Sequence, residues 1–167
     1  MVTLRCTRKL LKRIGPQPRS HGLAATCALG NWFANIVYLH SQPFVIAVSE
    51  RAFIAVFFPA RALREGVGPA FLQAVASLLL RIGAPRGTVE RELALMSPTL
   101  IAPTNSHQVV GVMNQYALDV RFIERERLSL SLPELELHFA SGVTGALRLT
   151  TPQEAALSLL SAVHAVM

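Results

Sequence analysis

Apolar residues in the first third of the chain alternate with polar ones or run continuously, as in strands, whereas later segments have the spacing of amphipathic helices. This pattern predicts five strands, at residues 2–6, 32–39, 44–48, 53–58 and 99–102. The segment 53–58 is continuously apolar, so a short buried helix is the alternative there. Because the strands do not alternate regularly with helices, we expect an α+β fold with a small, mostly antiparallel sheet.

About four to five helices are expected to pack on this sheet. The clearest covers residues 69–82, where apolar side chains form one wide face and Gly83 follows at the position of a left-handed C-cap. Thr151 and Glu154 flank a proline in the pattern of a capping box, which predicts the start of the last helix. The other helices are expected after Thr7, from Thr88 to Met96 and from Ser106 to Phe122.

Residues 128–139 fit two structures. The leucines at the start of this segment alternate with serines, which is typical of a strand. Pro133 followed by Glu134 is equally typical of the first turn of a helix. The periodicity alone leaves both structures open.

The length of 167 residues, 51% of them apolar, predicts one domain over residues 1–167 and excludes a disordered chain. No stretch reaches the roughly 18 apolar residues that a membrane helix needs. Two cysteines are too few for a disulfide framework or a four-cysteine zinc site. We therefore expect a cytoplasmic protein that does not contact a membrane, with Cys6 and Cys27 as free thiols.

The sequence contains no recognisable catalytic or cofactor-binding motif. It has no glycine loop for a nucleotide, no HExxH and no GxSxG. The histidines and cysteines do not stand at metal-ligand spacing, so we expect no metal and no cofactor. The carboxylates between Glu124 and Glu136 alternate with arginine, serine or leucine, which is typical of a solvated edge rather than of an acid–base pair.

Positive charge is concentrated near the N-terminus. The net charge is +6, arginine outnumbers lysine fourteen to two, and no acidic residue occurs before Glu50. Such a run attracts phosphates, although a solvated helix face is the simpler interpretation. The candidate nucleic-acid-binding residues are Arg5, Arg8, Lys9, Lys12 and Arg13.

Two polar segments within apolar surroundings are candidate ligand or partner sites. In the first, a Gly-Asn turn leads into an aromatic strand. In the second, Asn105 or Ser106 caps a helix whose free N–H groups could hold an anion, and a glycine inside that helix indicates close packing or ligand approach. The alternative is that these residues serve only internal packing and loop hydrogen bonds. The candidate residues are Asn31, Trp32, Asn35, Asn105, His107, Gly111 and Asn114.

Several segments, taken in order, resemble the motifs of one family of uncharacterised bacterial proteins, a domain of unknown function. Residues 5–11 match R-C-T-x-K-L-L, residues 29–35 resemble L-G-D-W-x-A-N, and residues 104–115 resemble T-N-N-R-S-V-L-G-S-M-N-D. A pattern that begins L-P-E-L is echoed at residues 132–135. The resemblance implies a small α+β domain of the bacterial cytosol, sometimes found in mobile elements, and it implies no reaction. It also favours a helix from Pro133 to about residue 140.

Three hypotheses about function follow. The first is a binding module whose partner is a protein or a nucleic acid, with the basic N-terminal helix and the region from Asn105 to Asn114 as its surface. The second is an enzyme of unrecognised type that binds an anion at the helix N-terminus near Asn105. It requires Asn105, His107 and Asn114 to converge on one pocket with Asn31 or Asn35. The third is a subunit of a toxin–antitoxin or phage-defence pair, whose apolar surface would bind a partner or form a homo-oligomer.

Overall fold

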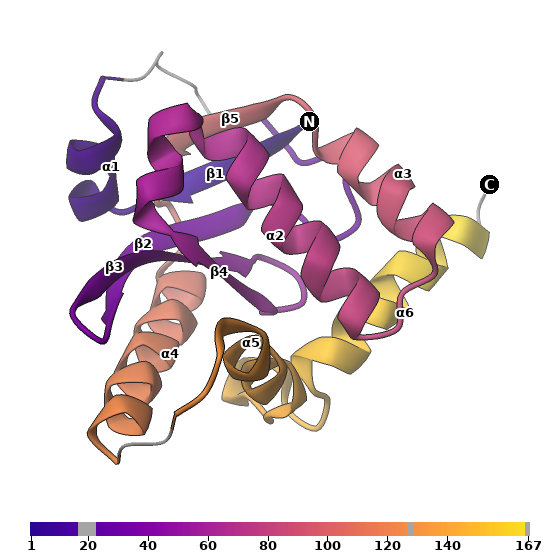
Figure 1. The fold of residues 1–167 in the computed structure, drawn as a ribbon. Helices are drawn as coiled ribbons and strands as arrows, with labels where there is room; N and C mark the ends of the chain where they lie inside the picture. Colours follow the sequence, from indigo (N-terminus) through magenta and orange to yellow (C-terminus); the bar gives the residue numbers. More distant parts are fainter. Residues whose placement is uncertain (17–22, 127–128, 166–167) are drawn as a thin grey trace.

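The computed structural model describes residues 1–16, 23–126 and 129–165 of the chain. Its centre is a five-stranded sheet with the order β4-β3-β2-β1-β5 (Figure 1). The strands are β1 (Val2–Cys6), β2 (Trp32–Leu39), β3 (Gln42–Ser49), β4 (Ala55–Pro59) and β5 (Thr99–Pro103). The five predicted strands are thus confirmed, with small differences at their ends.

The α+β fold class is confirmed, but the sheet is mixed rather than mostly antiparallel. β1 pairs parallel with both of its neighbours, β2 and β5, whereas β3 pairs antiparallel with β2 and β4. The connections explain the difference. Helical segments lie between β1 and β2 and between β4 and β5, and such crossovers allow parallel strands. β2 and β3 are instead joined by a tight turn in which His40 and Ser41 both have positive φ.

The described residues form six α-helices, one more than the four to five expected, and two short 3₁₀ helices. They are α1 (Arg8–Ile14), η1 (Ala60–Glu65), α2 (Val67–Arg81), α3 (Arg86–Met96), α4 (His107–Arg125), α5 (Leu132–Ser141), η2 (Gly145–Leu147) and α6 (Pro152–Ala165). α2 begins before Pro69, because Gly66 is its N-cap residue. α3 begins before Thr88, because its N-cap residue is Pro85.

Of the segment 128–139, residue 128 lies outside the described residues, residues 129–131 form neither strand nor helix, and the rest belongs to the helix at 132–141. Ser131 Oγ accepts a hydrogen bond from the Glu134 N–H at 3.4 Å, and a carboxylate oxygen of Glu134 accepts one from the Ser131 N–H at 2.7 Å. This capping box stabilises the first turn. The buried side chains of Leu135 and Phe139 are four residues apart, which places both on one face of the helix.

Helices cover both faces of the sheet (Figure 1). On one face, Phe71 of α2 meets the ring of Trp32 edge-on, with 5.3 Å between the ring centroids. On the other face, Tyr116 of α4 packs on Phe139 of α5 with 4.7 Å between the centroids. The Tyr116 hydroxyl also donates to the Phe53 carbonyl at 3.0 Å. The sheet therefore separates two apolar cores.

Two buried glutamates connect this framework. Glu92 of α3 accepts hydrogen bonds from the N–H groups of Ala28 and Leu29, at 2.9 and 3.0 Å. Glu136 of α5 does not lie on the solvated edge that its sequence context predicts. It is 3% exposed, accepts a hydrogen bond from the Phe57 N–H at 2.8 Å and pairs with Arg81. The expectation was wrong because a helix, unlike an alternating strand, turns Glu136 toward β4.

Candidate functional site

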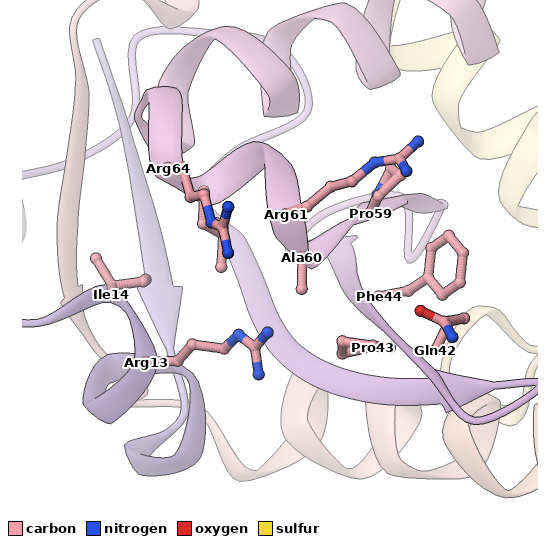
Figure 2. A pocket seen from close by; sticks show the side chains of 10 residues that line it. Arg13, Ile14, Gln42, Pro43, Phe44, Pro59, Ala60, Arg61 and Arg64 are labelled. Atoms are coloured by element: carbon pink, nitrogen blue, oxygen red, sulfur yellow. The ribbon is translucent and has the colours of Figure 1, made fainter.

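A hollow lies where α1, η1 and the start of β3 meet, and we call it the arginine groove (Figure 2). It has a volume of about 560 Å³. Its lining residues are Arg13, Ile14, Gln42, Pro43, Phe44, Pro59, Ala60, Arg61, Leu63 and Arg64. Three arginines from two separate segments of the chain therefore meet around one hollow.

Local structure explains how these arginines come together. α1 begins at the N-cap Thr7, whose hydroxyl accepts from the Leu10 N–H, and Arg13 lies in its last turn. η1 follows β4 directly, and in a 3₁₀ helix residues three apart lie on one side, so Arg61 and Arg64 share a side. Figure 2 shows Arg13 and Arg64 directed into the space between α1 and η1, with Arg61 extended beside Pro59.

The charge of the arginine groove is uncompensated within the described residues. Arg13, Arg61 and Arg64 are all exposed, and no aspartate or glutamate lines the hollow. None of the three forms an ion pair with a carboxylate of the described chain. The three guanidinium groups are therefore available to form ion pairs with an anion that enters the groove.

A second hollow, of about 270 Å³, lies between α1 and α4 beside the end of β2, and we call it the amide cleft. It brings together Asn35 and Asn114, two candidates from different polar segments, and Lys9 from the basic helix. The oxygen Oδ1 of Asn35 accepts hydrogen bonds from the Thr7 hydroxyl at 2.7 Å and from the Ile36 N–H at 2.8 Å. The full lining is Lys9, Asn35, Ile36, Val37, Tyr38, Asn114, Ala117, Leu118 and Arg121.

Two candidate residues of the first polar segment belong to the interior. Trp32 is fully buried against Phe71. Asn31 is 7% exposed, and its side-chain oxygen accepts from the Thr3 N–H at 3.0 Å. The aromatic strand that suggested a ligand site is the central strand β2, whose side chains fill both cores. Trp32 and Asn31 are therefore not surface groups.

The candidates at the start of α4 are exposed but do not line the amide cleft. Ser106, not Asn105, is the N-cap residue, and its Oγ accepts from the Val109 N–H at 3.4 Å. Asn105 and His107 lie outside the cleft that contains Asn35 and Asn114. Gly111 is exposed, and a Cβ there would meet nothing within 4 Å, so close packing does not explain this glycine.

The basic candidates near the N-terminus separate into three groups. Arg5 is buried, at 8% exposed, and its guanidinium donates to the Pro103 carbonyl at 3.2 Å. Arg8 and Lys12 are exposed on α1 outside both hollows. Lys9 and Arg13 line the amide cleft and the arginine groove, respectively. Side chains alternate between the two faces of β1, and Arg5 is on a face that other elements cover. The number of positive charges in the sequence does not reveal that this arginine is buried.

The residues of these hollows that sequence reasoning did not single out include Arg61, Arg64, Tyr38 and Arg121. The spacing of Arg61 and Arg64, directly after a strand that ends in proline, is a signal that could have identified a shared side. Arg121 follows Asn114 at helical spacing of seven residues, which also places both on one face of α4. No signal in the neighbouring sequence identifies Tyr38 as a lining residue, because its exposure depends on where β1 ends.

The described residues offer little for covalent or metal chemistry. No cluster of three or more His, Cys, Asp or Glu side chains within them could hold a metal ion. Burial raises the pKa of Cys6 to about 12 and the pKa of Cys27 to about 11, so both are protonated thiols at neutral pH.

No helix in the described parts of the chain is long and apolar enough to span a membrane.

Comparison with known proteins places the chain in a family without assigning an activity. No curated protein and no solved structure shows significant similarity to it. One family model, described as "Domain of unknown function (DUF6933)", matches residues 3–155, a range that includes both hollows. The expected kinship with an uncharacterised family is thereby confirmed. The chain belongs to the DUF6933 family, whose function is unknown.

Proposed function

We propose that this protein is a binding module that holds a single-stranded nucleic acid by its phosphates in the arginine groove. The observation that carries the proposal is that Arg13, Arg61 and Arg64 all line one hollow, with no carboxylate among its lining residues. Guanidinium groups that line one hollow repel one another, so an anionic ligand in that hollow relieves the repulsion. A phosphate does this well, because a guanidinium can bind it through two parallel hydrogen bonds.

A nucleic acid supplies several phosphates in a row, which matches several arginines along one groove. Gln42 and Phe44 lie in the same hollow and offer an amide for base edges and a ring for stacking. The net charge of +6 adds long-range attraction. A hollow suits a strand with unstacked bases, whereas a duplex presents a groove that receives a protruding helix or ribbon.

The proposal is tested by fluorescence anisotropy with labelled oligouridylate and oligothymidylate at a series of salt concentrations. For single strands, the slope of log K against log salt is negative, and each lost phosphate contact makes it shallower by about 0.7, so Arg61→Gln combined with Arg64→Gln is expected to make it shallower by about 1.4. The same double variant is expected to weaken binding at low salt about tenfold or more.

The matched control removes two exposed arginines elsewhere, by Arg86→Gln combined with Arg148→Gln. Its net charge equals that of the groove variant, so only a local role of the groove separates the two. Absence of binding at low salt, or equal losses in both double variants, would exclude the arginine groove as a nucleic-acid site. Stronger binding of a duplex with the same sequence would exclude the single-stranded ligand.

A further inference from the structure

The geometry of the amide cleft points to a second site, at which an extended acidic peptide segment of a partner protein adds as a strand to the free edge of β2. This site goes beyond the proposed nucleic-acid binding, because it involves a different hollow and different residues. Three features support it: unpaired backbone groups at the end of β2, the positive charge of the cleft walls, and exposed apolar side chains on α4.

β2 extends beyond its neighbour β1 and therefore has a free edge. The last residue pair between these strands is Cys6 with Ala34, and the Thr7 N–H still donates to the Ala34 carbonyl at 3.0 Å. The chain then enters α1, whereas β2 continues to Leu39. The segment 35–39 consequently pairs with β3 on one side only.

The backbone groups at this edge belong to Ile36 and Tyr38, because the groups directed to one side of a strand recur at every second residue after Ala34. The Ile36 N–H donates to the side-chain oxygen of Asn35. The Ile36 carbonyl and the N–H and carbonyl of Tyr38 have no hydrogen-bond partner within the described chain. One donor and two acceptors thus remain for an added strand.

The edge strand β4 shows how this chain blocks an edge elsewhere. There the Phe57 N–H donates to the buried carboxylate of Glu136 at 2.8 Å. Unpaired edge groups are a template for another strand unless they are blocked or covered. At Tyr38 no side chain of the described residues blocks the N–H, and α1 and α4 leave a hollow of about 270 Å³ beside it. The edge of β2 is therefore open at Tyr38, which is 46% exposed, whereas Ile36 is 5% exposed.

The walls of the amide cleft determine the charge of the peptide. Lys9 of α1 and Arg121 of α4 line the cleft, and no aspartate or glutamate does. The Lys9 ammonium lies 4.9 Å from the centre of the Tyr38 ring, and neither cation pairs with a carboxylate of the described residues. The carboxylates of an added strand complement both cations, and the amide of Asn114 can donate to them as well.

Exposed apolar side chains beside the cleft can contact the peptide side chains that do not face the cations. Leu118, in the cleft, is 56% exposed, and Phe122, one turn further along α4, is 60% exposed. Side chains of a strand alternate between its two faces. Main-chain hydrogen bonds then supply affinity, and the alternating side chains supply specificity. The occupant is thus a segment in which acidic residues alternate with aliphatic ones.

The experiment adds a short, terminally blocked peptide, in which glutamate alternates with valine, to isotope-labelled protein and follows the backbone amides by NMR. We expect the Tyr38 amide signal to shift and its hydrogen exchange to slow about tenfold or more at saturation. A peptide with lysine in place of glutamate is expected not to bind. N-methylation of alternate residues should abolish binding, because it removes the donors of an added strand while the charge stays the same.

Variants separate this site from the arginine groove. Lys9→Gln combined with Arg121→Gln should weaken binding of the glutamate peptide about tenfold. Arg61→Gln combined with Arg64→Gln, and the control pair Arg86→Gln with Arg148→Gln, should leave it unchanged. Because all these side chains are exposed, a loss of folding is not expected, and circular dichroism checks it.

Three results would overturn the inference. One is equal binding of the lysine peptide or of the N-methylated peptide. Another is unchanged exchange at Tyr38 when the glutamate peptide is bound. The third is slow hydrogen exchange at the Tyr38 amide without the peptide, when only an oligonucleotide is added or the protein concentration is raised. The occupant of the edge would then be a nucleic acid or a second copy of the chain.

Discussion

Cys6 and Cys27 are both buried, and burial raises the pKa of the first thiol to about 12 and that of the second to about 11. Only the thiolate reacts readily, so neither group is an accessible nucleophile in the folded protein. Cys6 lies on β1, at the centre of the parallel part of the sheet. Both cysteines therefore act as small core residues.

We predict that Ellman's reagent at pH 8 labels neither thiol in the native protein and labels both after unfolding in urea. Because the folded pKa values lie above the ordinary value of 9.0, the unfolded state loses these protons first. The stability of the fold should therefore decline as pH rises through the window from about 9 to about 12. A thiol that reacts rapidly in the native protein would contradict this prediction.

Single residues also show which of the candidates from the sequence line a hollow in the fold. Asn35, Asn114, Lys9 and Arg13 all lie in a hollow, and their types and spacing identified them as candidates. Trp32 lies in the core instead. It was a candidate because a buried tryptophan and a ligand-binding tryptophan have the same sequence context. Residue type shows which chemistry a side chain offers, whereas burial decides whether a partner can reach it.

At the level of elements, side-chain caps mark the start of several helices, although α2 and α3 begin without one. α5 and α6 both start with a reciprocal capping box, at Ser131 with Glu134 and at Thr151 with Glu154. The box at Ser131 overrides the alternating leucines that precede it. Hydrogen bonds between the cap and the carboxylate form within four residues, so they do not depend on the rest of the fold.

We predict that Ser131→Ala lowers the free energy of unfolding by about 1 kcal/mol, as loss of an N-cap usually does. Urea unfolding followed by circular dichroism measures the change. Ser129→Ala is the control, because Ser129 is exposed and caps no helix, and its effect should be close to zero. Equal effects of the two substitutions would show that the cap contributes nothing.

The same cap has a pH dependence of known sign. Hydrogen bonds from the backbone and hydroxyl of Ser131 lower the pKa of Glu134 below its usual value of 4.5. The stabilisation is therefore present above about pH 4.5 and is lost as the pH falls through the folded pKa. The difference between Ser131→Ala and the unchanged protein should accordingly narrow in acid.

At the scale of the whole molecule, Glu136 connects helices on opposite faces of the sheet. It lies on α5, accepts a hydrogen bond from Phe57 in β4 and pairs with Arg81 at the end of α2. Burial raises its pKa, against the opposing effects of Phe57 and Arg81. The folded protein therefore holds this proton to a higher pH than the unfolded chain, and stability falls as pH rises through that window.

We predict that Glu136→Ala lowers the free energy of unfolding by about 3 kcal/mol, because it leaves a buried N–H and part of a guanidinium without a partner. The control is Glu90→Gln, which breaks the exposed pair with Arg86 and should change stability by about 0.5 kcal/mol or less. Urea unfolding of both variants checks the contrast. A cost for Glu136→Ala no larger than that of the control would show that this connection between the layers is dispensable.

The sequence by itself determined the features that depend on neighbours a few residues away: the five strands, most of the helices, several of their caps and the basic character of α1. Tertiary structure alone decided the features that depend on residues distant along the chain. These are the parallel pairing of β1 with β2 and β5, the burial of Glu136 and the meeting of Arg13 with Arg61 and Arg64. The physical reason is range. A cap or a period is stabilised by local hydrogen bonds and one apolar face, whereas a hollow exists only where separate elements pack without filling the space between them.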